Sequence, residues 1–486
     1  MAWNPLKVKL YKVDFRGRCV RKPSVPIAAA IILCILCFRA SAQLPDITSG
    51  EKSQTSEAGA DASPAMLPHF AEGRFWISGQ CNFIYQANPG FHAPYSGPNS
   101  FRSRYQKATS RVSTLYTGLQ LKRYTEVLLD VEAASGLGLS SAVGIAAFTD
   151  LDSVRDPTLS AAPYLSRLMF HQVISLGHDE TEGSRGPLST FPELPTRRLE
   201  LRIGKFAITD FFDSNSVGSD SHLQFLNWAT DQNGAYDFTA DSRGYTWGVY
   251  AEYQSRDVGF RFGEALMPGP NLGGPLVWNL HKANTSNGEL EIHRAFLNKQ
   301  TGMVRLLGYL NHGNMGIYRS AILEYLSGKT AKPDIDRHPL QVTAKYGFGV
   351  NVEQNLTSRM TVFGRFGWNN GKTESWSFTE IDQTVSTGFG LLGDTWHRRN
   401  DRGGIAFASN GISSDHARYL SYGGVGLILG DGRLNYGREQ LIETYYTAHL
   451  WRGIYTGPDL QYVINPGYNR DRGPILIPSV RLHFEI

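Results

Sequence analysis

The sequence predicts an all-β fold, namely a transmembrane antiparallel β-barrel of about 16 strands with long extracellular loops. Three observations lead to this prediction. Apolar and polar residues alternate with a period of two in many segments of the chain. The connections between these segments are alternately short and long. The N-terminus has the composition of an export signal.

The first alternating segment, "RFWISGQCNFIYQ", covers residues 74–86. One face carries Phe75, Ile77, Gly79, Cys81, Phe83 and Tyr85, and the other carries Arg74, Trp76, Ser78, Gln80, Asn82 and Gln86. The same period recurs in residues 197–206, 341–354, 358–368 and 480–486. The last segment sets Val480, Leu482, Phe484 and Ile486 against Arg481, His483 and Glu485. We expect it to pair with the first strand and close the barrel, with its apolar face and Cys81 towards lipid.

The connections between strands differ in length in a regular way. Tight turns are expected at residues 254–257, 298–302 and 356–358. The long connections are rich in Gly, Pro, Asn and aromatic residues, and cover residues 87–108, 134–166, 207–243 and 311–338. One connection, 177–197, is long where a short turn is expected, and we interpret it as a hairpin extension. A helical turn, "SDHARYL", is predicted in the loop near residues 414–433.

Residues 1–42 have the features of a signal peptide. Eight Lys or Arg and one Asp accompany an apolar run at 27–38, and "ASA" at 40–42 offers a cleavage site. The formal charge of the whole chain is +4 and that of this leader is +7, which leaves −3 and argues against a nucleic-acid partner. Only Cys81 remains of the four cysteines, so no internal disulfide is expected. We expect residues 43–72 to be a flexible segment and residues 73–486 to form the barrel domain.

A soluble β-sandwich also shows alternation, because one face of each sheet packs on a second sheet. Two features favour a membrane barrel. The apolar faces mix aliphatic residues with Gly and many aromatics, as lipid-facing surfaces do. The polar faces carry several charges on one strand, such as Arg198, Glu200 and Arg202, which suits a wet interior. A barrel of about 16 strands encloses an aqueous lumen, so a pore is the expected function.

Several segments resemble the carbohydrate-selective porin family of the OprB type. They are "GKFAITDFFDSNSVGSDSHLQFLNWATDQNGAYDF" (204–238), "LNYGREQLIETYY" (434–446), "PDLQYVINPG" (458–467) and "NPGYNRDRGP" (465–474). The resemblance covers residues 73–486. It implies a sixteen-stranded barrel of the bacterial outer membrane that admits monosaccharides and similar small sugars to the periplasm by facilitated diffusion. The chain ends in Ile486 where such barrels commonly end in Phe, so we expect the barrel-assembly machinery to recognise Phe484.

Sugar passage needs polar groups that replace water and an aromatic platform for the C–H faces of the sugar. Each candidate residue could equally be an ordinary wall residue, so the set is a stronger prediction than any member. The predicted constriction residues are Trp76, Gln80, Asn82, Arg111, Asp130, Glu132, Arg202 and Lys205. Arg111 is expected to oppose Asp130 and Glu132 across the lumen. The loops at 88–101 and 210–220 are expected to fold inward or to form an external cap.

Other functions receive less support from the sequence. It contains no H-E-x-x-H, G-x-S-x-G or G-x-x-x-x-G-K-[ST] pattern, so no catalytic residue, metal or cofactor is predicted. A broad-specificity porin for small polar solutes is the nearest alternative. A barrel enzyme and a secreted all-β binding protein are less favoured. The expected partners are small sugars, outer-membrane lipids and the assembly machinery, while the preferred sugar and the oligomeric state stay open.

Overall fold

The computed structural model describes residues 12–13, 19–20, 65–67, 73–269, 274–295, 297, 300–337, 342–376 and 378–486. The chain divides into two units, Met1–Thr55 and Ser56–Ile486. In the first unit, β1 (Lys12–Val13) pairs antiparallel with β2 (Cys19–Val20). Apart from these two strands and residues 65–67, the predicted leader and the predicted flexible segment lie outside the described residues.

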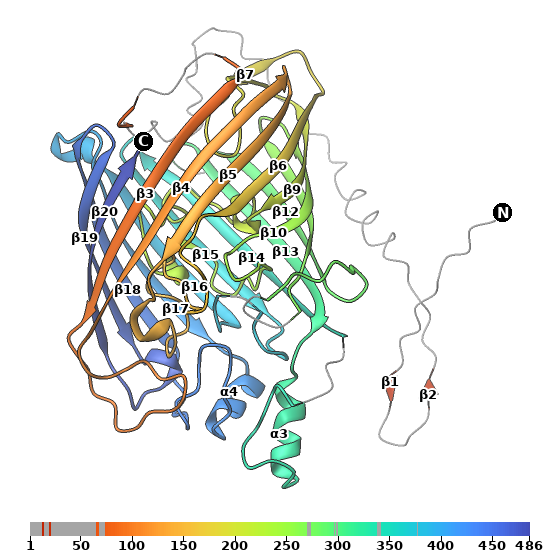
Figure 1. The fold of residues 1–486 in the computed structure, drawn as a ribbon, viewed down its shortest axis with the longest axis vertical. Coiled ribbons are helices and arrows are strands. Elements are labelled where there is room, and N and C mark those ends of the chain that lie inside the picture. The colour runs from red at the N-terminus through yellow and green to blue at the C-terminus, as the bar shows by residue number, and fades with distance from the viewer. Residues whose placement is uncertain are drawn as a thin grey trace. The chain divides into compact units, whose positions relative to one another are not determined.

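Sixteen strands of the second unit form one closed antiparallel barrel, as predicted (Figure 1). Its strands are β3 (Phe75–Asn88), β4 (Gln106–Lys122), β5 (Thr125–Ser135), β6 (Tyr164–Ser175), β9 (Arg198–Phe206), β10 (Thr246–Gln254), β11 (Val258–Leu266), β12 (Asn284–Arg294), β13 (Gly302–Asn314), β14 (Val342–Thr357), β15 (Met360–Asn369), β16 (Gln383–Leu392), β17 (Arg402–Gly411), β18 (Glu439–Trp451), β19 (Ile454–Ile464) and β20 (Ile475–Glu485). Each strand pairs with its neighbours in chain order, and β20 pairs with β3. Closure leaves no strand edge unpaired, which is the requirement that lipid imposes on a sheet.

The seam between β20 and β3 confirms the prediction made from the last alternating segment. Arg481 lies opposite Ile84 and His483 lies opposite Asn82 on the inner face. Val480 and Leu482 point outward, with 53% and 37% of their surface exposed. The apolar row of this strand therefore lies on the outer surface and the charged row lines the lumen.

Short and long connections lie at opposite ends of the barrel. Two of the long ones carry α3 (Tyr318–Leu326) and α4 (Ser414–Ser421), at the end away from the C-terminus (Figure 1). The long connections also contain α2 (Trp228–Asp231) and the 3₁₀ turns η1 (Leu139–Ser141), η2 (Ile208–Asp210) and η4 (Pro466–Tyr468). Short turns join most strands at the other end, where η3 (Gly393–Trp396) also lies. The helical turn predicted near residue 414 is thus confirmed as α4.

The exception at residues 177–197 forms a hairpin, as predicted. It contains β7 (Glu180–Glu182) and β8 (Glu193–Pro195), which pair antiparallel with each other and lie outside the barrel sheet. Among the described residues, no helix combines the length and the apolar character that crossing a bilayer would need.

Candidate pore and constriction

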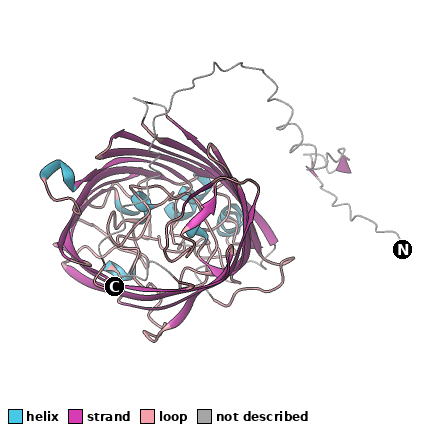
Figure 2. Cartoon of the chain, turned by 90° about the horizontal axis from the view of Figure 1, so that it is seen from above, coloured by secondary structure: helices cyan, strands magenta, loops and turns pink. Residues whose placement is uncertain are grey.

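The connection between β9 and β10, residues 207–245, folds into the barrel. Seen from above in Figure 2, loops and helices cross the space within the ring of strands. Most of the loop is buried, including Phe225 and Trp228. The prediction that residues 210–220 fold inward is confirmed. Residues 88–101 instead pack against other long loops, where Asn99 bridges to Gly430.

Inward-facing residues of the wall fasten this loop. The Glu443 carboxylate on β18 accepts hydrogen bonds from the backbone N–H of Leu226 (2.6 Å) and Asn227 (3.1 Å). On β15, Arg365 donates to the carbonyl oxygens of Thr230 (3.1 Å) and Gly218 (2.5 Å). Hydrogen bonds to charged groups are stronger than neutral ones, so the loop has a fixed position in the lumen.

Local sequence and wall composition explain how the loop fits. The Asn227 side chain caps α2 by accepting the N–H of Ala229. Glycines on the facing wall leave room for it, because a Cβ at Gly367 would collide with the Asn233 side chain. The loop is therefore positioned by its own turn residues and by small residues on strands distant in sequence.

A second loop, residues 136–163, also enters the lumen and packs on the first. Asn82 of β3 donates to Asp152 (2.6 Å) and Ser110 of β4 donates to Asp150 (2.6 Å). Phe148 meets the Trp228 ring edge-on, with ring centroids 6.0 Å apart. Phe378 of a third loop stacks on the same indole at 4.7 Å. Three loops thus share one aromatic contact inside the barrel.

The first group of charges at the narrowed lumen lies on β5, β6 and the inward loop. Arg167 binds Asp210 through two hydrogen bonds of 2.8 and 2.6 Å and reaches Asp130 at 3.2 Å. The Glu132 carboxylate accepts the hydroxyl groups of Tyr245 (2.9 Å) and Tyr164. Both signs of charge are therefore held rigidly, with aromatic rings beside them.

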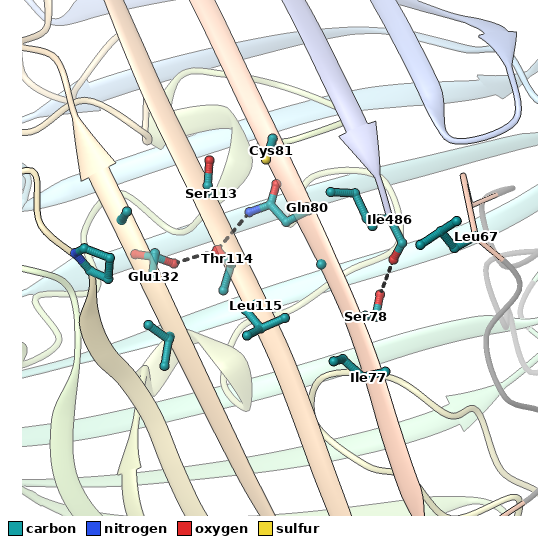
Figure 3. Close-up of a pocket in the computed structure, with 14 residues that line it drawn as sticks. Leu67, Ile77, Ser78, Gln80, Cys81, Ser113, Thr114, Leu115, Glu132 and Ile486 are labelled. Carbon is teal, nitrogen blue, oxygen red and sulfur yellow. Dashed lines mark hydrogen bonds between the residues drawn. The ribbon is translucent and has the colours of Figure 1, made fainter.

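Figure 3 shows how Glu132 is joined to the first strand. Gln80 donates to the Thr114 hydroxyl (3.1 Å), which donates to Glu132 (3.1 Å). The pocket drawn there, of about 530 Å³, is lined largely by outward-row residues such as Gly79 and Cys81. It is a groove on the outer surface and not the pore. Cys81 faces outward, as predicted.

A second polar group lies on the inward loop and at the seam. The ring of His222 stacks on that of His483, with centroids 5.8 Å apart. His222 reaches Asp152 at 3.4 Å, and His483 reaches Glu485 at 3.1 Å. The side chains of His222 and Glu485 are 29% and 27% exposed, compared with 14% for Arg167. Water in the lumen therefore reaches His222 and Glu485 more readily than it reaches Arg167.

The structure places six of the eight predicted residues on inward rows. They are Trp76, Gln80, Asn82, Asp130, Glu132 and Arg202. Trp76, Gln80 and Asn82 are at most 3% exposed, so other groups cover them. Covered in this way, Trp76 offers no open aromatic platform. Arg202 pairs with Glu200 at 2.9 Å and lies over the Phe211 ring.

The predicted position of Arg111 is wrong. Its cross-strand neighbours are Phe83 and Ser135, which belong to outward rows. The inner row of β4 is instead Ser110, Val112 and Thr114, so polarity does not separate the two faces of this strand. Arg111 lies near the long-loop end of β4, where a long cation can extend along the surface to polar surroundings.

The predicted position of Lys205 is also wrong, because this residue does not lie on the row that faces the lumen. It lies in register with Leu168 and Trp247, in the row that continues to the exposed Ile203. Its ammonium group binds Asp241 of the inward loop at 3.3 Å. Lys205 therefore fastens the loop at the rim and is not part of the predicted row of wall charges.

Comparison with known proteins identifies the class of this pore. The family model "Carbohydrate-selective porin, OprB family" matches residues 99–486. The chain belongs to the OprB family. It is therefore a bacterial outer-membrane porin, a channel and not an enzyme, as the sequence resemblance predicted.

The OprB-family chain is also similar to two known proteins. Porin AaxA of Chlamydia muridarum is 24% identical over 298 residues, which are 60% of this chain and 53% of that protein. The chain thus matches about half the length of that relative. The high-pH structure of Pseudomonas putida OprB has a TM-score of 0.62 at 15% identity, covering 84% of this chain and 94% of that one. This structural likeness concerns the fold.

Membership in the family also orients the barrel. In outer-membrane barrels the short turns are periplasmic and the long loops are extracellular. The end of the OprB-family barrel that carries α3 and α4 is therefore extracellular, and the 177–197 hairpin is periplasmic.

Proposed function

We propose that this porin conducts small carbohydrates, monosaccharides and similar sugars, into the periplasm by facilitated diffusion. The observation that carries the proposal is the fixed set of opposite charges around Arg167, Asp130, Asp210 and Glu132. The guanidinium group donates hydrogen bonds and the carboxylates accept them, so the set can bind sugar hydroxyl groups in either role.

Aromatic and imidazole rings beside these charges support the same proposal. The rings of Tyr164 and Tyr245 lie next to Glu132, with centroids 6.5 Å apart. The imidazole rings of His222 and His483 stack on each other, and His222, whose side chain is 29% exposed, adds ring nitrogens that can bind a hydroxyl group. A sugar has both C–H faces and hydroxyl edges, and a channel lined in this way can hold each weakly enough for release.

The test compares solutes of matched size in liposomes that contain the purified porin. Swelling rates for monosaccharides should exceed those for neutral amino acids. Glu132→Gln keeps the side-chain size and removes the charge, and we expect it to lower that ratio by about two- to fivefold, since charge-assisted hydrogen bonds are roughly twice as strong as neutral ones. Arg111→Gln is the matched control, because that residue lies on the outward row and should leave the ratio unchanged.

Equal swelling rates for sugars and amino acids of the same size would replace this proposal with a broad-specificity porin. An unchanged ratio in Glu132→Gln alone would assign the selectivity to another part of the lumen.

A further inference from the structure

The periplasmic connection between β6 and β9, residues 176–197, is much longer than the other periplasmic turns near it, such as residues 123–124. Porin turns on this side are short because they only reverse the chain. In Figure 1, β7 lies at the end of the barrel where the C-terminus is found. The path of the hairpin shows what the extra residues do.

The tip of this hairpin enters the barrel. Thr190 and Phe191 are fully buried. The backbone N–H of Thr190 donates to Glu126 Oε2 (2.9 Å), and its hydroxyl group donates to the same oxygen. Glu126 lies on the inner face of β5, where it is opposite Gln120 of β4. Thr190 is therefore bound to the lumenal side of the wall.

The wall has a matching recess. A Cβ at Gly118 on β4 would collide with Cγ2 of Thr190. Gly118 belongs to the inner row, since it pairs with Trp76 and Leu128, both of them buried. The absence of a side chain at Gly118 thus makes room for the tip.

A charged cluster underlies the tip. His171 lies between Glu126 (2.7 Å) and Glu200 (2.9 Å), and all three are buried on the inner face of the wall. The Phe191 ring packs 5.4 Å from the imidazole ring. Arg202 points its guanidinium to the carbonyl oxygen of Leu188 at 3.5 Å. The tip covers this cluster as part of the folded barrel.

The hairpin also reaches along the rim. Near its base, Glu180 forms an ion pair of 2.6 Å with Arg123 of the β4–β5 turn. Towards its tip, Arg185 donates to the carbonyl oxygen of Gly73, beside the start of β3 (3.1 Å). The segment thus extends from β9 past β6, β5 and β4 to β3, a span of roughly 20 Å at the usual spacing between strands.

We propose that residues 176–197 form a periplasmic collar that narrows the exit of the channel and sets an upper size limit for solutes. This limit is separate from the constriction made by residues 207–245. It concerns the size of the passing solute and does not depend on whether the channel prefers sugars.

The first experiment replaces residues 178–195 with an Asn-Gly turn in the full-length porin. We expect single-channel conductance in planar bilayers to rise by about twofold, because the exit is one of two narrow segments in series. In liposome swelling, trisaccharides should gain more than monosaccharides. A folded, heat-modifiable variant with unchanged conductance and an unchanged trisaccharide-to-monosaccharide ratio would overturn the proposal, and so would a fall in conductance.

A point variant provides an independent test that leaves the chain length intact. Gly118→Val fills the recess and should displace the tip, with a conductance increase in the same direction as the deletion. Adding Thr190→Ser removes the colliding methyl group but keeps the hydroxyl group that binds Glu126, and should restore the original conductance. Gly308→Val is the matched control, because a Cβ there meets nothing within 4 Å. Equal conductance in Gly118→Val and Gly308→Val would contradict the collar.

Discussion

Arg167 of β6 holds Asp210 of the inward loop through two parallel contacts, Nε to Oδ2 at 2.8 Å and Nη2 to Oδ1 at 2.6 Å. The same guanidinium reaches Asp130 on the neighbouring strand at 3.2 Å. One cation of the wall therefore fixes the first turn of the constriction loop and binds two carboxylates. A fork of this kind matches the geometry of a carboxylate, which a lysine could not reproduce.

Arg167→Gln should make the channel more selective for cations and less stable. Removing one partner leaves two carboxylates without their cation, and breaking a buried ion pair costs about 3 kcal/mol. The reversal potential in a KCl gradient and urea unfolding in bilayers measure the two effects. Arg111→Gln removes an identical charge from the outer face and should change neither quantity. The same reversal potential in both variants would refute the assigned role.

Trp228→Ala should destabilise the packing of the loops inside the barrel. The indole stacks on Phe378 and Phe238 and meets Phe148 edge-on, so its loss leaves a cavity among three rings. Large-to-small changes of this type cost about 3–5 kcal/mol. The check is the free energy of unfolding in bilayers.

Trp278→Ala is the comparison for that measurement. Trp278 is 72% exposed, and its removal should cost less than about 0.5 kcal/mol. Equal losses in the two tryptophan variants would show that the interior aromatic contact contributes nothing special.

Cys81 offers a direct test of which face is which. It is half-buried on the outward row, opposite Phe484 and Ser113. In proteoliposomes a lipophilic maleimide should label it, and a charged maleimide should not. Glu485→Cys in a Cys81→Ser background should show the reverse preference, because Glu485 faces the lumen. Labelling of Cys81 by the charged reagent alone would place that row in water.

The extracellular loops should lose stability at high pH through His416 of α4. Its ring is fully buried, with Asp382 at 3.1 Å, Glu380 at 3.2 Å and the Tyr318 hydroxyl at 3.1 Å. Burial disfavours the charged ring, but the hydrogen bonds to Asp382 and Glu380 outweigh it and raise the pKa of His416 to about 9. The charged imidazole therefore joins α3, α4 and the loop between β15 and β16.

The sign of the effect follows from the direction of the shift. A raised pKa contributes stability fully below the ordinary value of 6.5, and that contribution is lost as the pH rises through about 9. The pKa of Asp382 is lowered by the same contact against the effect of its burial, so its contribution is present above 3.8 and lost as the pH falls below it.

Hydrogen exchange of residues 318–326 and 414–421, corrected for intrinsic rates, should rise between pH 7 and about pH 10. Burial raises the pKa of Tyr419 above its ordinary value of 10.0, so that phenol does not titrate in this range. In His416→Gln the rise should disappear. A rise of the same size in that variant would exclude the histidine as its cause.

Much of the barrel could be predicted from local alternation. Strand β20 has one charged row and one apolar row, and in such a strand the sequence alone predicts which row faces the lumen. The closing pair follows from topology, because lipid forbids an open edge. The length rule also isolated residues 177–197 as unusual, although no local pattern shows that Thr190 binds inside the lumen.

The constriction was harder to predict for two reasons. The first is that the alternation of polar and apolar residues does not indicate the inner row on every strand. The sequence did not indicate Arg167 as a lumen residue, because Ser166 forms a bulge in the β5–β6 ladder. Asp130 pairs with Arg167 and Val131 pairs with Leu165, which leaves Ser166 unpaired in this ladder. The bulge breaks the period on which the prediction depended. Arg111 was misplaced because Val112, an apolar residue, takes the inner row of β4.

His222 and Trp76 show the second reason, which is that contacts between residues distant in sequence decide where a loop runs and which side chains are covered. His222 lies on a loop whose path depends on distant contacts such as those of Glu443 and Arg365. Trp76 does point inward, but its exposure depends on what covers it, which no strand pattern reports. The sequence could predict whether a strand side chain points into the lumen, but it could not predict whether that side chain is exposed there.

The seam between β3 and β20 has a consequence for biogenesis. The Ser78 hydroxyl donates to the carbonyl oxygen of Ile486, a residue 408 positions later. During secretion from the N-terminus, the first strand therefore emerges before the strand that closes the barrel against it. Because lipid leaves no partner for an unpaired strand edge, β3 is fully paired in the bilayer only once the final strand has reached it.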